Sequence, residues 1–298
     1  MKILITGAAG FVGSNLVSML VKEHDIVALD YLTSLVRSNL PEEITYLNYD
    51  LSKIDVSHLP HVDVVVHLAS VSIERVSENA MYESVNIASM LKVLELTRKT
   101  EAKLILSSSC SVYGNGLNFK ESDPLNPMSL YAIGKINEER YAEFYHYKYG
   151  LDVTILRYSN CFGDLTYIDN KFYLGKKDVM RIFMEQALQD KPLTVIGGQS
   201  RDFTFIDDVV DATAIMLDLK GFNVFNVATS VETQIEDIPP LIGKALSKKV
   251  ETQTIPPRGI DNLKQRSLNI DRISPFWKPK YSLEEGIKLY AERLKEKN

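Results

Sequence analysis

Three glycines separate an apolar run from a helical pattern at the start of the chain. Residues 2–6 form a short apolar run that predicts a strand, and residues 11–21 carry apolar side chains at helical spacing. Between them stand Gly7, Gly10 and Gly13. Glycines allow a ligand to approach the backbone closely, and the first N–H groups of a helix attract phosphate. The segment therefore predicts a dinucleotide-phosphate cradle, with a simple tight turn as the alternative.

Apolar runs of strand length recur along the chain and predict the fold class. The predicted strands cover residues 26–30, 44–49, 62–68, 104–107 and 153–156, and most are followed by a helical stretch. Several lack in/out alternation, which is typical of parallel strands covered on both faces. The pattern predicts an α/β fold, a Rossmann doubly wound parallel sheet with a smaller α/β substrate-binding domain. Long helices are expected at 82–99 and at 130–149, where Gly150 ends the second, and both are candidates for contact with a partner subunit.

Asp30 ends the second predicted strand and indicates which dinucleotide binds. A carboxylate there accepts hydrogen bonds from both adenosine ribose hydroxyls and repels a 2′-phosphate, so NAD is the expected cofactor. A helix-capping role for Asp30 is one alternative, and Arg37 keeps NADP open. Asp50 and Leu51, just after the third strand, are expected to contact the adenine.

The alternation of predicted strands and helices is interrupted after Gly163. Longer loops are expected there, around a predicted helix at 179–188 and a short strand at 193–196. The strand and helix pattern resumes at 203–219 and 224–227. The predicted domains are an NAD-binding Rossmann domain, residues 1–163 plus 203–229, and a substrate-binding domain, residues 164–202 plus 230–298. The segment 255–260, with two prolines and a glycine, is interpreted as a site-lining loop.

Composition excludes several kinds of partner. The formal net charge of -5 argues against a nucleic acid, because phosphate backbones require clustered Lys and Arg. The longest basic cluster, residues 293–297, is interpreted as a solvated helix face. Cys110 and Cys161 are too few for a thiol framework and fit a reducing, cytoplasmic location. No targeting segment, membrane span or metal site is expected.

Tyr131 and Lys135 stand four residues apart near the start of a predicted helix, so both project from one face. An ammonium beside a phenol stabilises the phenolate and lowers the tyrosine pKa toward the range of a general base. This spacing is common on ordinary helices. Here, however, a serine cluster that includes Ser109 ends an earlier strand, and the ends of adjacent strands meet. The three residues are therefore the candidate catalytic group.

With the glycine turn, this trio resembles the extended short-chain dehydrogenase/reductase family, specifically its NAD-dependent epimerase/dehydratase group, over nearly the whole chain. Further matching segments are residues 67–69, Asn86 and residues 157–163, 201–203, 207–209, 225–228 and 282–286. The resemblance implies that Ser109 hydrogen-bonds the reacting sugar oxygen, that Tyr131 exchanges its proton, and that Lys135 also holds the nicotinamide ribose. The chain departs from the family at Ala132 and Gly134, where Gly and Ser are usual, and at Ser72, which replaces a basic residue of some epimerases.

The same resemblance implies two sets of ligand contacts. The expected NAD-binding residues are Gly7, Gly10, Phe11, Val12, Gly13, Asp30, Asp50, Leu51, Leu68, Ala69, Ser70, Asn86, Tyr131, Lys135, Tyr158 and Ser159. The expected substrate-binding residues are Ser111, Asn160, Val179, Thr194, Ile196, Arg201, Arg258 and Asp261. The two arginines would grip the diphosphate, since a planar guanidinium suits phosphate oxygens. Packing roles for Asn86 and Tyr158, and surface ion pairs for the arginines, are the alternatives.

The strand-end motif narrows the reaction that the resemblance implies. Related 4,6-dehydratases carry Asp-Glu where this chain has Cys110 and Ser111, and the glutamate of the decarboxylases is also missing. The cysteine of the 3,5-epimerase/reductases would fall at position 111, so Cys110 is interpreted as a packing residue, with a catalytic acid as the alternative. What remains is 4-epimerisation of a nucleotide sugar. In that reaction Tyr131 takes the 4-hydroxyl proton, NAD takes the C4 hydride, and the transient 4-keto sugar turns over and receives the hydride back.

UDP-glucose and UDP-galactose are the expected substrates of such an enzyme. Hexuronate epimerases tend to carry an arginine soon after the position of Asn160, and residues 164–170 contain none. UDP-N-acetylhexosamine and UDP-glucuronate remain open, because the pocket-gating position falls near Gln265 in a stretch without a firm alignment. An NAD(P)H-dependent 4-ketoreductase is the nearest alternative. A non-catalytic dinucleotide sensor would be expected to lack Tyr131 or Lys135. A homodimer is expected.

Overall fold

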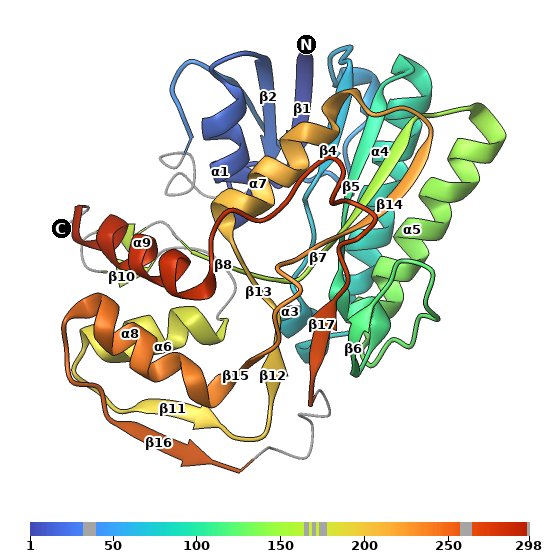
Figure 1. Cartoon of the computed structure of the whole chain (residues 1–298). Helices are drawn as coiled ribbons and strands as arrows, with labels where there is room; N and C mark the ends of the chain where they lie inside the picture. The colour runs from blue at the N-terminus through green and yellow to red at the C-terminus, as the bar shows by residue number, and fades with distance from the viewer. Residues whose placement is uncertain (32–39, 164–166, 169–170, 173–177, 257–263, 297–298) are drawn as a thin grey trace. The chain divides into compact units, whose positions relative to one another are not determined.

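The computed structural model describes residues 1–31, 40–163, 167–168, 171–172, 178–256 and 264–296 (Figure 1). The strands are β1 (Lys2–Thr6), β2 (Asp25–Asp30), β3 (Thr45–Asn48), β4 (Val64–His67), β5 (Lys103–Ser109), β6 (Gly116–Phe119), β7 (Val153–Tyr158), β8 (Asn160–Phe162), β9 (Tyr167–Ile168), β10 (Lys171–Phe172), β11 (Leu193–Ile196), β12 (Ser200–Arg201), β13 (Phe203–Phe205), β14 (Phe222–Val227), β15 (Thr233–Gln234), β16 (Thr252–Ile255) and β17 (Arg266–Leu268). The helices are α1 (Phe11–Leu20), α3 (Ile73–Glu78), α4 (Tyr82–Thr100), α5 (Leu130–Tyr149), α6 (Val179–Leu188), α7 (Ile206–Ile215), α8 (Ile238–Leu246) and α9 (Leu283–Glu296). None of the helices within these ranges has the length and apolar character needed to cross a membrane.

Seven strands form the central sheet in the order β14-β7-β5-β4-β1-β2-β3. β1 pairs in parallel with both β2 and β4, and the outer neighbours β3 and β5 continue the parallel pairing. The chain thus adds strands first on one side of β1 and then on the other. Ligands of open α/β sheets bind outside the carboxyl ends of the strands at such a reversal. The predicted doubly wound sheet is confirmed, and Thr6, Leu29 and His67 align at that edge.

Both faces of the sheet are covered, which explains why its strands lack alternation. α4 packs against α5 and β4, and α5 packs against β5. The core on this face includes Leu4, Val65 and Leu104. The neighbouring strand residues Ile3 and Ile5, whose side chains point the other way, are completely buried too. Each large apolar side chain buried in this manner contributes about 1.5–3 kcal/mol to folding.

The long helices begin and end where their local sequence signals lie. α5 has the predicted bounds, with Ser129 Oγ accepting a hydrogen bond from the Ala132 N–H at 3.1 Å. At its other end Gly150 adopts a left-handed φ of 72° and donates its N–H to the His146 carbonyl. α4 starts at Tyr82 as predicted and ends one residue later than predicted. These two helices required no tertiary information to be located.

The chain divides into two compact units. The first consists of Met1–Val112, Pro127–Arg157 and Val210–Phe225, and the second of Tyr113–Asn126, Tyr158–Val209 and Asn226–Asn298. These bounds differ from those of the predicted domains, because β6 pairs with β17 and β8 pairs with β13 within the second unit. Compactness follows strand pairing, whereas the prediction followed the positions of motifs.

The described residues of the second unit include short strand pairs and the helices α6, α8 and α9. β11 pairs in parallel with β16, and β12 pairs antiparallel with β15. α8 packs against both α6 and α9, and α6 packs against β11. The helix predicted at 179–188 and the strand predicted at 193–196 are confirmed as α6 and β11. This unit thus combines helices and strands, as expected for the smaller α/β domain.

Candidate functional site

The glycine turn after β1 has no room for side chains at two of its positions. A Cβ at Gly7, whose φ is +68°, would lie 2.7 Å from the Ala69 backbone nitrogen. A Cβ at Gly13 would lie 2.1 Å from the Gly7 carbonyl oxygen. Gly10 precedes α1 without a side-chain cap, so the first-turn N–H groups keep the capacity to bind an anion. This geometry fits the pyrophosphate of a dinucleotide.

Asp30 ties this turn to the end of β2. One carboxylate oxygen accepts the Ala9 N–H at 2.9 Å and the other accepts the Tyr31 N–H at 2.8 Å. Burial raises the Asp30 pKa, and the two backbone hydrogen bonds oppose that rise. The carboxylate is half-buried, with further lone pairs for the ribose hydroxyls that the sequence assigned to it.

Asp50 and Leu51, the two predicted adenine contacts, differ from Asp30 in what their side chains contact. The Asp50 carboxylate accepts hydrogen bonds from the Ser52 N–H and hydroxyl and lies 2.9 Å from Lys53 Nζ, so its partners lie in its own turn. Leu51 is buried in the apolar core of the sheet. Both residues follow β3, as the sequence predicted.

The loop after β4 passes close to the glycine turn. Leu68 donates its N–H to the Thr6 carbonyl at 3.1 Å, and the Ala69 N–H lies 3.3 Å from Thr6 Oγ1. Asn86, on α4, accepts the Val71 N–H at 2.7 Å. The Ser70 side chain is exposed. Asn86 therefore holds the backbone of the loop that carries three of the predicted cofactor contacts.

Tyr131 and Lys135 meet on one face of α5 as predicted from their spacing. Lys135 Nζ lies 5.8 Å from the centre of the Tyr131 ring. The lysine side chain is only 3% exposed, and Nζ donates to Glu138 Oε2 at 2.8 Å and to the Ser107 carbonyl at 3.2 Å. Burial lowers the Lys135 pKa, but the charges of Glu138 and Tyr131 outweigh it and the net shift is upward. The lysine is thus held as an ammonium beside the phenol.

Ser109 stands at the end of β5, where α5 packs on the strand. Ser108 Oγ bonds to Glu139 at 2.5 Å, and Arg157 makes two hydrogen bonds to the same carboxylate. Glu139 lies one turn beyond Lys135, so these contacts bring the helix face that carries Tyr131 onto the serine-bearing end of the strand. Ser109 Oγ accepts the Ser111 N–H at 3.1 Å.

Two neighbours of Ser109 differ in what their side chains do. The Ser111 hydroxyl is buried and has no hydrogen-bond partner among the described residues. An orphaned buried hydroxyl is costly unless a ligand or water satisfies it, which fits the substrate contact expected of Ser111. Cys110 is buried, which agrees with its interpretation as a packing residue.

His67 belongs to this region, although no role was predicted for it from the sequence. Its Nδ1 lies 2.7 Å from Thr6 Oγ1, while its buried Nε2 has no hydrogen-bond partner within the described part of the chain. Burial and the positive charge of Lys135 lower the His67 pKa to about 3. The imidazole is therefore neutral. The available signal was its position at the end of β4, level with Thr6.

The second unit holds the remaining two predicted cofactor residues. Ser159 donates its N–H to the Val227 carbonyl at 2.9 Å, and its hydroxyl lies 2.6 Å from Thr204 Oγ1. Tyr158 is buried at the end of β7. Both side chains are packed, so a cofactor contact here would be made through the backbone.

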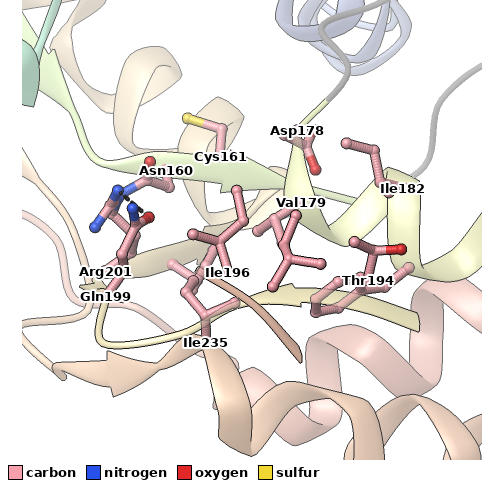
Figure 2. Close-up of a pocket in the computed structure, with 13 residues that line it drawn as sticks. Asn160, Cys161, Asp178, Val179, Ile182, Thr194, Ile196, Gln199, Arg201 and Ile235 are labelled. Carbon is pink, nitrogen blue, oxygen red and sulfur yellow. Dashed lines mark hydrogen bonds between the residues drawn. The ribbon is translucent and has the colours of Figure 1, made fainter. Parts of the chain in front are cut away.

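A pocket of about 320 Å³ lies in the second unit (Figure 2). It brings together five predicted substrate residues: Asn160, Val179, Thr194, Ile196 and Arg201. Ile255, the first residue of the predicted site-lining loop, also lines the pocket. The sequence missed the other lining residues, which are Cys161, Asp178, Ile182, Phe183, Gln199, Phe203 and Ile235. The predicted Arg258 and Asp261 lie outside the described residues, as does Arg37.

Polar groups gather at one end of this pocket. Arg201 donates to Gln199 Oε1 at 2.9 Å and to the Ser200 carbonyl at 2.7 Å, and Asn160 Nδ2 donates to the Asp202 carbonyl (Figure 2). Apolar side chains such as Ile196 and Ile235 line the middle, and Thr194 lies at the far end. A concave apolar surface with a few convergent polar groups is typical of a small-molecule site.

Comparisons with known proteins identify the family of the chain and support its fold. The model of the NAD dependent epimerase/dehydratase family matches residues 3–228. A UDP-glucose 4-epimerase of Mycolicibacterium smegmatis is 31% identical to this chain, and the alignment covers all of both proteins. The structure of UDP-glucose 4-epimerase from Thermotoga maritima with UDP-glucose superimposes with a TM-score of 0.91, at 29% identity over 99% of each chain. UDP-glucuronic acid 4-epimerase from Bacillus cereus, in complex with UDP-glucuronic acid and NAD, gives 0.88 at 28% identity, again over 99% of each chain.

Proposed function

Because the chain belongs to the NAD-dependent epimerase/dehydratase family, we propose that it is an NAD-dependent 4-epimerase that interconverts UDP-glucose and UDP-galactose. The observation that carries the proposal is the buried Lys135 ammonium 5.8 Å from the Tyr131 ring, in the unit whose glycine turn excludes side chains. A phenol beside a cation is suited to removing a hydroxyl proton. Bound NAD supplies the hydride acceptor and donor at C4 of the sugar.

The residues of this chain have separate roles in the proposed reaction. Tyr131 takes the proton of the 4-hydroxyl group and returns it after the sugar has turned over. Ser109 donates a hydrogen bond to the same sugar oxygen, and Ser111 offers a buried hydroxyl without a protein partner to the substrate. Lys135 keeps its positive charge beside the phenol and uses its remaining N–H for the nicotinamide ribose, because Glu138 and Ser107 take the other two.

The first unit supplies the cofactor contacts of this proposal. The glycine turn would hold the pyrophosphate, Asp30 the adenosine ribose, and the loop that Asn86 supports would line the nicotinamide half. We assign residues 1–163 plus 203–229 to NAD binding and residues 164–202 plus 230–298 to the substrate. The support for NAD over NADP is the half-buried carboxylate at Asp30, which would repel a 2′-phosphate.

The pocket of the second unit fits the nucleotide part of the substrate. Arg201, held by neutral oxygens of Gln199 and Ser200, is ready to bind diphosphate oxygens with charge-assisted hydrogen bonds. Thr194 and Ile196 would lie beside the uracil, and Asn160 would contact the sugar or its diphosphate. Residues 164–170 contain no arginine for a hexuronate carboxylate, so a neutral hexose is the proposed sugar.

A substrate screen with purified protein tests the proposal. UDP-glucose, UDP-galactose, UDP-hexosamines, UDP-glucuronate and dTDP-glucose are incubated without added reductant, and products are identified by mass and by epimer. We expect UDP-glucose and UDP-galactose to interconvert without net consumption of NAD. Turnover that requires one NADH per product would instead identify a ketoreductase.

Tyr131→Phe is the matched variant for this screen. It removes the phenolic proton acceptor and keeps the ring, so the epimerisation rate should fall roughly 100- to 10,000-fold. NAD binding, measured by fluorescence titration, should stay close to wild type. Full activity of this variant would contradict the proposed role of Tyr131.

We also propose a homodimer in a reducing, cytoplasmic environment. Leu91 on α4 and Phe144 and Tyr147 on α5 are exposed, and the two helices pack side by side. Their outer faces would be buried against a second copy. Sedimentation of wild type and of a Phe144→Glu variant tests this, with a shift toward monomer expected for the variant. Both cysteines are free, which suits a compartment where thiols stay reduced.

A further inference from the structure

Lys135 is the centre of a buried group of ionisable side chains that the proposed reaction does not by itself require. Glu138, one turn further along α5, is 1% exposed and bonds to Lys135 Nζ at 2.8 Å. Burial raises the Glu138 pKa, and the lysine charge opposes that rise. Removing one partner of a buried ion pair leaves the other charge uncompensated. The charge state of Lys135 therefore depends on Glu138.

A second carboxylate reaches the same region from α4. Gly134 has no side chain, and the space where its Cβ would lie is taken by Glu83, whose Oε1 would be 1.8 Å away. Glu83 Oε2 accepts a hydrogen bond from Asn86 at 3.1 Å, while Oε1 is buried without a partner among the described residues. The negative charge of Glu83 acts on both Lys135 and Glu138.

The third neighbour, His67 on β4, adds no charge, because its pKa is lowered to about 3. Tyr131 on the same helix is a further titratable group whose charge acts on the ammonium. Two carboxylates and one phenol thus surround a single cation, and the closest carboxylate is also the one with the direct hydrogen bond.

We propose that Glu138 is a positioning residue, which keeps Lys135 protonated and directs its ammonium between the Glu138 carboxylate and the Ser107 carbonyl, with Glu83 adding a weaker negative charge through the gap at Gly134. The proposal rests on the proposed function for its effect on catalysis. Its effect on the protonation of Lys135 holds whether or not the chain is an epimerase.

Glu138→Gln tests the proposal, because the amide keeps the shape of the side chain and removes its charge. The protonation of Lys135 is followed by NMR in protein labelled with ¹³C at the lysine Cε, and its signal is assigned by its absence from Lys135→Arg. We expect the midpoint of Lys135 titration to fall by at least about one pH unit, since an opposite charge at hydrogen-bond distance is lost. Glu83→Gln should lower the midpoint by less.

A control on the same helix has the same spacing. Glu143 pairs with the exposed Arg140 three residues earlier, at 2.6 Å, as Glu138 pairs with Lys135. Glu143→Gln should leave the Lys135 midpoint unchanged. Glu138→Asp keeps the negative charge and should restore most of the wild-type midpoint, which also gives a reading if Glu138→Gln folds poorly.

The pH profile of the holoenzyme gives the second reading. In Glu138→Gln the basic limb of kcat should move to lower pH, so that activity declines where wild type still holds its plateau. If Glu138 only stabilised the fold, its replacement would lower kcat by the same factor at every pH. An unchanged Lys135 midpoint in Glu138→Gln would overturn the inference. If the midpoint shifts in Glu138→Gln but the wild-type protein does not epimerise the substrates, only the proposed function is overturned.

Discussion

Around Lys135 in the first unit, ionisable side chains share a buried space, whereas the pocket of the second unit is lined mainly by apolar side chains with polar groups mainly at one end. The Lys135–Glu138 pair on α5 is joined by Glu83 from α4 and His67 from β4, in addition to the catalytic candidates. Around the pocket, Arg201 and Asn160 meet mostly backbone or amide oxygens.

This difference reflects two tasks. The ammonium beside a proton acceptor must keep its charge, and buried ionisable groups achieve this because each is sensitive to its neighbours in a medium of low polarity. Binding the nucleotide part of a substrate requires shape and a few directional contacts. We therefore expect the first unit to respond sharply to small changes in volume or charge, and the pocket to respond in proportion to the contact that is removed.

Gly13→Ala should give the largest effect and tests the sensitivity of the first unit to volume. The added methyl group would meet the Gly7 carbonyl oxygen at 2.1 Å and the Ala8 backbone at 2.8 Å, so the turn must shift. We expect the free energy of unfolding to fall by about 3 kcal/mol and NAD affinity to be lost. Urea unfolding and fluorescence titration with NAD provide the measurements.

Gly198→Ala is the matched control in the second unit. Unlike Gly13, Gly198 has a positive φ, +72°, and nothing lies within 4 Å of its hypothetical Cβ. Its cost is limited to the left-handed backbone, about 1–2 kcal/mol, and NAD binding should not change. Equal losses of stability and of NAD affinity in the two variants would contradict the expectation that the first unit is more sensitive to added volume than the second.

His67→Gln should give the next largest effect and concerns charge. The folded protein keeps His67 neutral with a pKa of about 3, below the ordinary value of 6.5. Because the unfolded chain binds the proton more readily, this group stabilises the fold fully above about pH 6.5, and the contribution is lost as pH falls toward 3. Between pH 7 and pH 5 wild type should lose about 2 kcal/mol that the variant does not lose.

Chemical denaturation at the two pH values measures this difference. Equal acid sensitivity of wild type and His67→Gln would show that other groups carry the pH dependence. A control variant at His58 should behave as wild type, since the side chain of His58 is exposed.

Arg201→Lys should give the smallest of these effects and probes the pocket. A lysine keeps the positive charge but cannot reproduce the forked contacts with Gln199 and Ser200 or a bidentate grip on phosphate. We expect KM for the nucleotide sugar to rise about tenfold, which corresponds to about 1.4 kcal/mol, with kcat nearly unchanged. A fall in kcat with KM unchanged would place Arg201 in the chemical step and not in binding.

The sequence by itself determined the elements whose signals are local. The glycine turn between a strand and a helix, the spacing of Tyr131 and Lys135, and the bounds of α5 from Ser129 to Gly150 depend on residues within one or two turns of each other. The sheet also followed, because continuous apolar strands alternating with helices leave few arrangements that bury both faces. The family resemblance rested on the same motifs.

Tertiary structure decided which side chains from distant segments share a buried space. The pairing of Glu138 with Lys135 could be inferred from their i,i+3 spacing, but spacing does not reveal that the pair is buried. Glu83 and Gly134 come together only through the packing of α4 on α5, and Ile235 and Gln199 reach one pocket from different strands and turns. Burial shifts the pKa values of the ionisable side chains in this space. Burial is a property of the folded chain and not of any local pattern.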